Sequence, residues 1–327
     1  MREAVPFTAD VCAGLDVCPG AYNIGMQSEE APEFQKSWLD FHVAVPGWLY
    51  HYTTAEGLLG ILRDRSMFGT HYRFLNDPLE IVWGVGLVAQ HIEEYIRTAE
   101  EPIKVVLRQF QGLPIEKYWD IYVACFCAEG NLLSQWRAYG KSGGYSLAFR
   151  GRELQLAQLP ERRLRRVIYD GSEQDRWVRL ALEWFVHKIA AIRRSEDGVA
   201  AVDVDAILEV SRQMWVALCE MCISFKLHVF EEESEWRVFE IVPKRATLSD
   251  VSSLKFRSKA GILVPYRAFP TERATEAQRI QPLDYIECGP TLSREDVEQS
   301  LLMFLRSEGY SGVWVRSSMI PIKPAFE

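Results

Sequence analysis

Three charged residues alternate along one short segment of the chain: Glu233, Glu235 and Arg237. If a strand begins by Glu233, its period of two places all three side chains on one face, while Trp236 and Val238 enter the core. A fixed carboxylate can stabilise positive charge or accept a proton, and a guanidinium can keep a carboxylate ionised or bind a phosphate oxygen. A solvated acidic loop with a surface ion pair is the alternative, but the large apolar Trp236 favours an ordered strand.

His51 and Thr53 form a second candidate pair. The segment Trp48 to Thr53 is rich in aromatic residues and indicates a strand that places His51 and Thr53 on one face and Tyr50 and Tyr52 on the other. An imidazole beside a hydroxyl can orient a ligand. The alternative is a buried histidine that hydrogen-bonds to the main chain.

Aromatic residues form the third candidate group. Trp136 and Tyr139 are three residues apart, on one face of an expected helix, and Tyr145 follows a glycine-rich entry to a strand. Their rings can stack on a flat ligand, although ordinary core packing is the commoner explanation for such residues. Asn76 precedes a helix expected to be capped by Asp77, so capping is the alternative explanation for it.

Hydrophobic periodicity predicts the elements that must position these residues. Strands are expected at 48–53, 67–74, 121–127, 145–149, 166–169, 236–242, 261–264, 285–288 and 312–316. Helices are expected at 55–63, 77–100, 131–139, 172–194, 204–225 and 293–307. This order predicts an α/β (α+β) fold, a mixed sheet flanked by helices, with a helical insertion at about 172–225.

The first 45 residues differ from the rest of the chain. Seven acidic and two basic residues precede residue 42, and glycines and prolines interrupt this segment without any periodicity. We therefore expect residues 1–45 to form an acidic, irregular extension and residues 46–327 to form a single α/β domain.

The composition excludes several classes of protein. The 327 residues include 37 Lys and Arg against 45 Asp and Glu, which argues against general nucleic-acid binding through net charge. No apolar run reaches the roughly 18 residues of a membrane span, and seven scattered cysteines fit reduced thiols, so we expect a cytoplasmic protein without membrane contact.

Several motif-like patterns have simpler explanations. The dinucleotide-like pattern from Gly84 to Ala89 lies inside an expected helix, not at a strand-to-helix turn. Cys219 and Cys222 form a lone pair within another helix and are interpreted as packed thiols. Neither HExxH, GxSxG nor GxxxxGK[ST] occurs, and no metal is expected.

Many short motifs, in order, resemble one family. They are His51-Tyr52-Thr53, Asn76-Asp77-Pro78 with Glu80, Cys125-Phe126, Trp136 with Tyr139, the 144–149 strand, Lys226, Glu233-x-Glu235-x-Arg237, Gly309-Tyr310 and 317–321. With them the chain resembles, from about Trp48 to Pro321, the bacterial family called domain of unknown function 2971. That family has no established activity. The chain departs from it at Phe230, where the family tends to have Trp.

The His-Tyr-Thr strand is also remotely similar to the entry of the ADP-ribosyltransferase fold. This resemblance implies a split sheet, NAD as cofactor, a first-strand residue holding the ribose and a later glutamate facing the scissile bond. His51 would match the first role and Glu235 the second, with Glu233 orienting the acceptor or removing its proton. The residues expected to bind the cofactor are His51, Tyr52, Thr53, Asn76, Trp136, Tyr139, Tyr145 and Arg237.

We therefore expect an NAD-dependent ADP-ribosyltransferase-like enzyme of a bacterial toxin or phage-defence type. Its acceptor would be a protein, a nucleic acid or water. A non-catalytic sensor that binds a nucleotide is one alternative. A metal-dependent nuclease or hydrolase is the other, with Asp77, Glu80, Glu233 and Glu235 as metal ligands.

Overall fold

The computed structural model describes residues 45–76, 79–140, 144–158, 162–192, 204–244, 253–259, 261–274, 279–291 and 293–320. Apart from residue 45, the extension expected at 1–45 lies outside these ranges. Asp77, the expected helix cap, lies outside them as well, and the side chain of Glu80 is not described.

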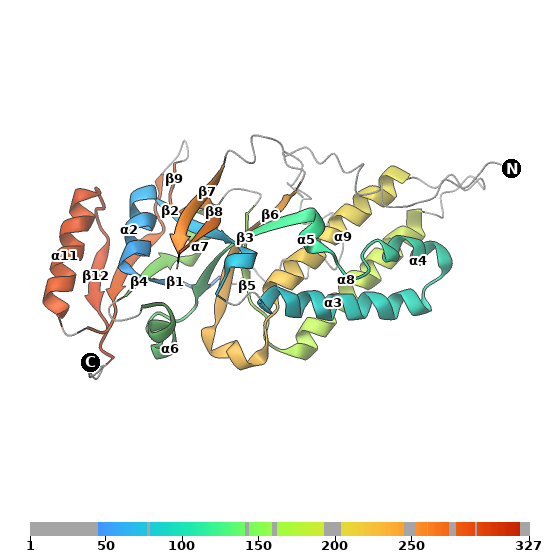
Figure 1. Ribbon diagram of the computed structural model, residues 1–327, viewed down its shortest axis with the longest axis horizontal. Coiled ribbons are helices and arrows are strands. Elements are labelled where there is room, and N and C mark those ends of the chain that lie inside the picture. Colours follow the sequence, from blue (N-terminus) through green and yellow to red (C-terminus); the bar gives the residue numbers. More distant parts are fainter. Residues whose placement is uncertain are drawn as a thin grey trace.

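A mixed sheet forms the centre of the protein (Figure 1). Its strands are β1 (Trp48–Thr53), β2 (Ser66–His71), β3 (Trp119–Cys127), β4 (Tyr145–Arg150), β5 (Arg162–Arg166), β6 (Glu235–Pro243), β7 (Leu254–Lys259), β8 (Ile262–Pro270), β11 (Leu283–Cys288) and β12 (Trp314–Ser317). The order is β12-β11-β4-β1-β3-β2-β8-β7, and β6 pairs with both β3 and β5. Strands β11 and β12 are parallel, whereas the other neighbours in the described sheet are antiparallel, which confirms a mixed sheet. A separate hairpin joins β9 (Arg273–Ala274) and β10 (Arg279–Ile280).

The sheet divides along one edge of β3. Strand β6 pairs with β3 along its whole length, so β1 and β2 share the opposite edge. There, Cys127 pairs with Tyr50 of β1, and Val123 pairs with Thr70 of β2. Cys125 lies between these two pairings, at the point where β1 and β2 part.

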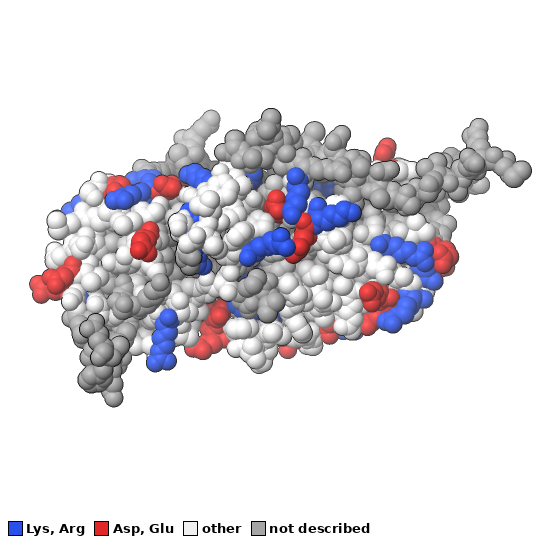
Figure 2. All heavy atoms as spheres, viewed as in Figure 1, with Lys and Arg blue, Asp and Glu red and all other residues white. Residues whose placement is uncertain are grey.

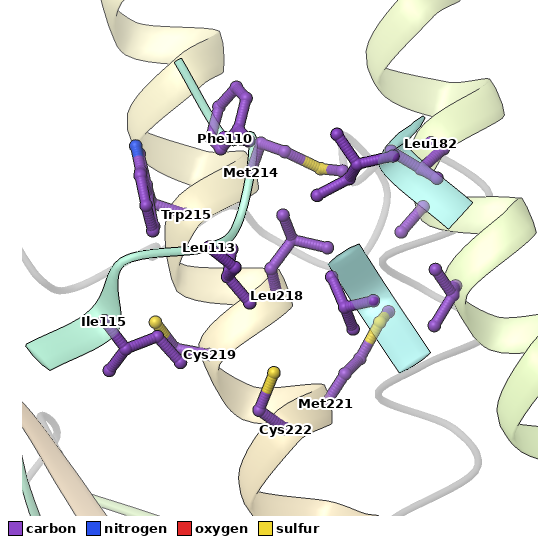
Figure 3. Packing of buried hydrophobic residues seen from close by; sticks show 14 of the residues in the cluster. Phe110, Leu113, Ile115, Leu182, Met214, Trp215, Leu218, Cys219, Met221 and Cys222 are labelled. Atoms are coloured by element: carbon purple, nitrogen blue, oxygen red, sulfur yellow. The ribbon is translucent and has the colours of Figure 1, made fainter. Parts of the chain in front are cut away.

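Four helices pack on one face of the sheet (Figure 1). They are α3 (Leu79–Thr98), α4 (Glu101–Arg108), α8 (Gly171–Ile192) and α9 (Val204–Ser224). Cys219 and Cys222 lie fully buried in the hydrophobic core between them (Figure 3), which confirms the interpretation as packed thiols. Gly84 of α3 allows α3 and α9 to approach closely, since a Cβ at Gly84 would lie 2.6 Å from the Cα of Cys222 in α9.

A second core covers the opposite face. It includes residues of α2 (Ala55–Asp64), α7 (Gly151–Ala157) and α11 (Arg294–Ser307). The side chain of Thr54 caps α2 by accepting a hydrogen bond from the N–H of Gly57. Because both faces of β3 are covered, its nearly continuous apolar sequence is explained.

Two expected elements have different positions in the structure. The strand expected at 166–169 is wrong: β5 occupies 162–166, and Arg162 and Arg165 are buried in ion pairs with Glu240 and Glu220. The arginine-rich segment Arg162–Arg166 can form a buried strand because Arg162 and Arg165 each meet a carboxylate on a neighbouring element.

The single helix expected at 131–139 is also wrong. A short α6 (Leu133–Gln135) passes into a π-helical turn, Trp136–Gly140. Periodicity also did not predict α4, α7, β7, the β9–β10 hairpin, the short helix α5 (Ile115–Tyr118) or two 3-10 turns, η2 (Tyr72–Phe74) and η4 (His228–Glu233).

Basic and acidic side chains are interspersed among the described residues on the face shown in Figure 2. Within the described residues, no helix combines the length and apolar character needed to cross a membrane.

Candidate functional site

The candidate carboxylates meet at the start of β6. Ser234 adopts a left-handed conformation (φ 43°, ψ 49°) that ends the 3-10 turn η4 and starts the strand. Glu233 is therefore the last residue of the turn and not, as the alternation predicted, a member of the strand. Lys226 nevertheless brings Glu233 and Glu235 together, because its Nζ lies 2.5 Å from a carboxylate oxygen of the first and 3.2 Å from one of the second.

Arg237 holds Glu235 from the same face of β6. Its Nε and Nη2 donate to the two carboxylate oxygens at 2.9 and 2.7 Å, and its Nη1 donates to the carbonyl of Ile223 at 2.6 Å. Glu235 is 7% exposed and Arg237 is 1% exposed. Of the two roles considered for Arg237, this geometry favours support of Glu235 over contact with a phosphate.

The surroundings keep Glu235 ionised. Burial raises the pKa of this carboxyl, but Arg237, Lys226 and a hydrogen bond from the Cys125 thiol outweigh burial and lower the pKa to about 2. A charged, rigidly held carboxylate therefore lies on the strand next to β3 at neutral pH.

Tyr139 and Asn76 extend this cluster. Burial, together with Cys125 and the carboxylates Glu233 and Glu235, raises the pKa of Tyr139 to about 12, although a hydrogen bond with Asn76 opposes this rise. The phenol therefore stays protonated at neutral pH and can act as a hydrogen-bond donor.

His51 lies at the point where β1 and β2 part. Its Nδ1 is 2.8 Å from the carbonyl oxygen of Cys125. A carbonyl only accepts, so Nδ1 carries the hydrogen and Nε2 presents a lone pair. Burial lowers the pKa of His51 to about 4, with a further lowering by Arg257 and an opposing effect of the Cys125 hydrogen bond. The ring is therefore neutral, and the main-chain bond expected for a core histidine is present.

Cys125 connects the two halves of this arrangement. Its carbonyl binds His51, and its thiol hydrogen-bonds Glu235. The described contacts thus connect His51 and Glu235 through Cys125, Glu233 and Glu235 through Lys226, and Tyr139 with Asn76. We call these residues, together with Arg237, the Cys125 cluster.

Tyr52 and Trp136 instead form a buried support. The Tyr52 hydroxyl donates to the carbonyl of Glu129 at 2.9 Å and accepts from the N–H of Leu132 at 3.0 Å. The Trp136 ring is 2% exposed and meets Tyr52 edge to face at 4.9 Å. Tyr139 packs against this pair while remaining partly exposed, so it is the aromatic residue best placed to meet a ligand.

The remaining candidates lie elsewhere. Tyr145 packs against the core formed with α2 and α11. Thr53 lies so close to α2 that a Cβ on Gly57 would be 2.0 Å from its hydroxyl. Thr53 therefore supports the start of α2.

Sequence reasoning grouped Lys226 with the acidic segment but assigned it no role, and it did not identify Cys125 as a site residue. Both occur among the family motifs. Lys226 lies seven residues before Glu233, and only the turn η4 brings them together. Cys125 acts through both its main chain and its side chain, which no spacing could predict.

Fold and site together define a mixed α/β protein with a buried, charge-paired glutamate at the start of a central strand. Residues 135–238 match the family described as "Protein of unknown function (DUF2971)". The match supports the resemblance indicated by the sequence, over a segment that includes Trp136, Tyr139 and the 226–237 motif. No curated protein and no solved structure matches the chain.

Among the described residues, no group of three His, Cys, Asp or Glu side chains has an arrangement that could hold a metal ion. Asp77 and the side chain of Glu80 lie outside those residues. Between Glu233 and Glu235 lies the ammonium group of Lys226, so the geometry gives the metal-dependent alternative no additional support.

Proposed function

We propose that the protein cleaves the bond between nicotinamide and ribose in NAD and transfers ADP-ribose to an acceptor. The observation that supports this proposal is the Cys125 cluster, in which an ionised glutamate and a neutral histidine contact the same residue at the division of the sheet. The remote resemblance to ADP-ribosyltransferases points to the same two residues.

The reaction would need the following roles. As the glycosidic C–N bond breaks, nicotinamide leaves with the bonding electrons and positive charge develops on the ribose. Glu235 would stabilise this charge, and His51 would accept a hydrogen bond from a ribose hydroxyl at Nε2. An oxygen or nitrogen of the acceptor then bonds to the ribose carbon and loses a proton, which Glu233 would accept. Tyr139 would contact the nicotinamide ring.

The acceptor class is the open part of the proposal. A protein side chain, a nucleic-acid base or water each satisfies the chemistry. A bacterial toxin or phage-defence role fits an enzyme of this kind that acts within a cell.

One observation favours a second candidate function, a non-catalytic nucleotide sensor. Both oxygens of Glu235 already accept hydrogen bonds from Arg237, and the residue is largely buried. A carboxylate held in this way can stabilise the fold beside a binding site without touching the ligand.

The decisive experiment measures nicotinamide release from isotopically labelled NAD, with and without a mixture of cell protein, RNA and DNA. The unaltered protein should release nicotinamide and label one fraction. Glu235→Gln should lower release by at least ~100-fold, the size expected when a charge-stabilising group is lost.

Glu240→Gln is a matched control. Glu240 lies on the same strand, is 5% exposed and pairs with Arg162 and Arg267, but it points to the opposite face. Its replacement should therefore carry a similar structural cost and leave release intact. No release by the unaltered protein, together with thermal stabilisation by NAD, would establish the sensor instead.

A further inference from the structure

Two basic residues beside the Cys125 cluster have no acidic partner in the part of the chain that the structure describes. Lys255, Arg257 and Lys259 alternate along the edge strand β7, so all three share one face. Lys255 pairs with Asp64 at 3.7 Å. Arg257 and Lys259 have no ion pair with any residue that the structure describes.

Arg257 reaches from β7 over β2. Its Nη2 donates to the Thr70 hydroxyl at 2.9 Å, and its guanidinium lies 4.8 Å from the ring centre of Phe68. Its Nε is buried and has no acceptor among the described residues. A buried donor without an acceptor is uncommon and points to a missing ligand or water.

Lys259 has a single neutral partner in the described part of the chain. Its Nζ donates to the Asn76 amide oxygen at 2.7 Å. An ammonium carries three donors, so two have no acceptor among the described residues.

The two cations disfavour each other unless an anion binds. Burial lowers the pKa of Arg257, and burial together with Arg257 lowers the pKa of Lys259. A guanidinium and an ammonium held on one face suit the oxygens of a phosphate group.

This pair adjoins the candidate site at two points. Asn76 contacts both Lys259 and Tyr139, and Arg257 lies close enough to His51 to affect its protonation. An anion held by the two cations would therefore lie beside His51 and Tyr139.

We propose that Arg257 and Lys259 bind the phosphate groups of a nucleotide whose sugar lies at His51. That the nucleotide is NAD rests on the proposed function. That its phosphate groups are recognised here rests on the two cations alone. Lys255 lies on the same face of β7 and carries the same charge, but it is paired with Asp64. It therefore serves as the control.

The test measures binding of ADP and of adenosine to the full chain by titration calorimetry. Arg257→Gln and Lys259→Gln should each weaken ADP binding about 10-fold, the loss expected for a charged hydrogen bond, and leave adenosine binding unchanged. Lys255→Gln should change ADP binding by less than about 2-fold, since its charge is exposed and already paired. Arg257→Lys, which keeps the charge and loses the fork, should give an intermediate affinity.

Several results would overturn the inference. They are no ADP binding by the unaltered protein, equal losses for ADP and adenosine, and a loss in Lys255→Gln as large as in the other two variants. Binding of a single-stranded oligonucleotide in preference to ADP would assign the cations to nucleic acid instead. If Arg257→Gln fails to fold, Lys259→Gln and Arg257→Lys decide the question.

The outcome is separable from that of the proposed function. If ADP binding depends on both cations but no nicotinamide is released, this inference stands and the proposed enzymatic function is wrong. If the protein releases nicotinamide and neither substitution changes the KM for NAD, the proposed function stands and this inference is wrong.

Discussion

Strands β6 and β7 lie in one sheet, but their charged side chains have partners of different kinds. On β6, Glu235 is matched by Arg237 and Lys226, and Glu240 is matched by Arg162 and Arg267. On β7, Arg257 and Lys259 have only neutral partners among the described residues. The charges of the first strand have counterions within the fold, whereas those of the second have none among the residues that the structure describes.

This difference separates two uses of a buried charge. A paired ion holds its partner's geometry, and removing one member leaves the other uncompensated. An unpaired ion lowers stability until a ligand neutralises it, so its removal costs the folded protein little. Substitutions on the two strands should therefore have unequal effects on folding.

The largest effect is expected for Arg237→Met. The change leaves Glu235 buried without its bidentate partner and should lower the free energy of unfolding by about 3 to 5 kcal/mol. Arg257→Met should change it by less than about 1 kcal/mol, because it removes a cation without an acidic partner. Urea denaturation followed by tryptophan fluorescence measures both. Equal losses would show that the two strands do not differ as described.

The Glu235 carboxyl should also make folding sensitive to acid. Its pKa is about 2 in the folded protein against an ordinary 4.5, so its stabilisation is complete above pH 4.5 and is lost as the pH falls toward 2. The total amounts to about 3 kcal/mol. The difference in unfolding free energy between the unaltered protein and Glu235→Gln should therefore shrink between pH 6 and pH 3. Glu231→Gln, at an exposed carboxylate, should show no such change.

Alternation and helical spacing predicted those parts of the site that depend on local structure. The separation of His51 and Thr53 from Tyr50 and Tyr52 on β1 agrees with the pairing register, and the two long helices expected between 172 and 225 are α8 and α9. Each depends on a period that continues through several residues.

Single-residue departures from these periods could not be predicted. The left-handed conformation of Ser234 removes Glu233 from the strand, and a π-helical turn at Trp136–Gly140 replaces the end of the expected helix, although Tyr139 still packs against Trp136. The bond from His51 to Cys125 depends on where two strands part, which is a property of distant pairings.

A smaller pH effect is expected from His51. Its pKa is about 4 in the folded protein against an ordinary 6.5, so stability is complete above pH 6.5 and falls as the pH drops toward 4. At pH 5 the loss from this group should be about 2 kcal/mol relative to pH 8. His51→Asn retains a donor for the Cys125 carbonyl and should remove this loss, as measured by unfolding at each pH.

The smallest effects are expected on β7 without a ligand. Lys255→Gln removes an exposed pair with Asp64 and should destabilise the protein by less than about 0.5 kcal/mol. Lys259→Gln relieves its repulsion with Arg257 and should instead stabilise the protein by a similarly small amount at low salt. Screening at about 1 M salt should remove both differences, because these charges lie near the solvent. Thermal unfolding at low and high salt measures the two signs. A destabilising effect of Lys259→Gln that persists in high salt would mean that Lys259 supports the fold through Asn76 and that its charge is not available for a phosphate.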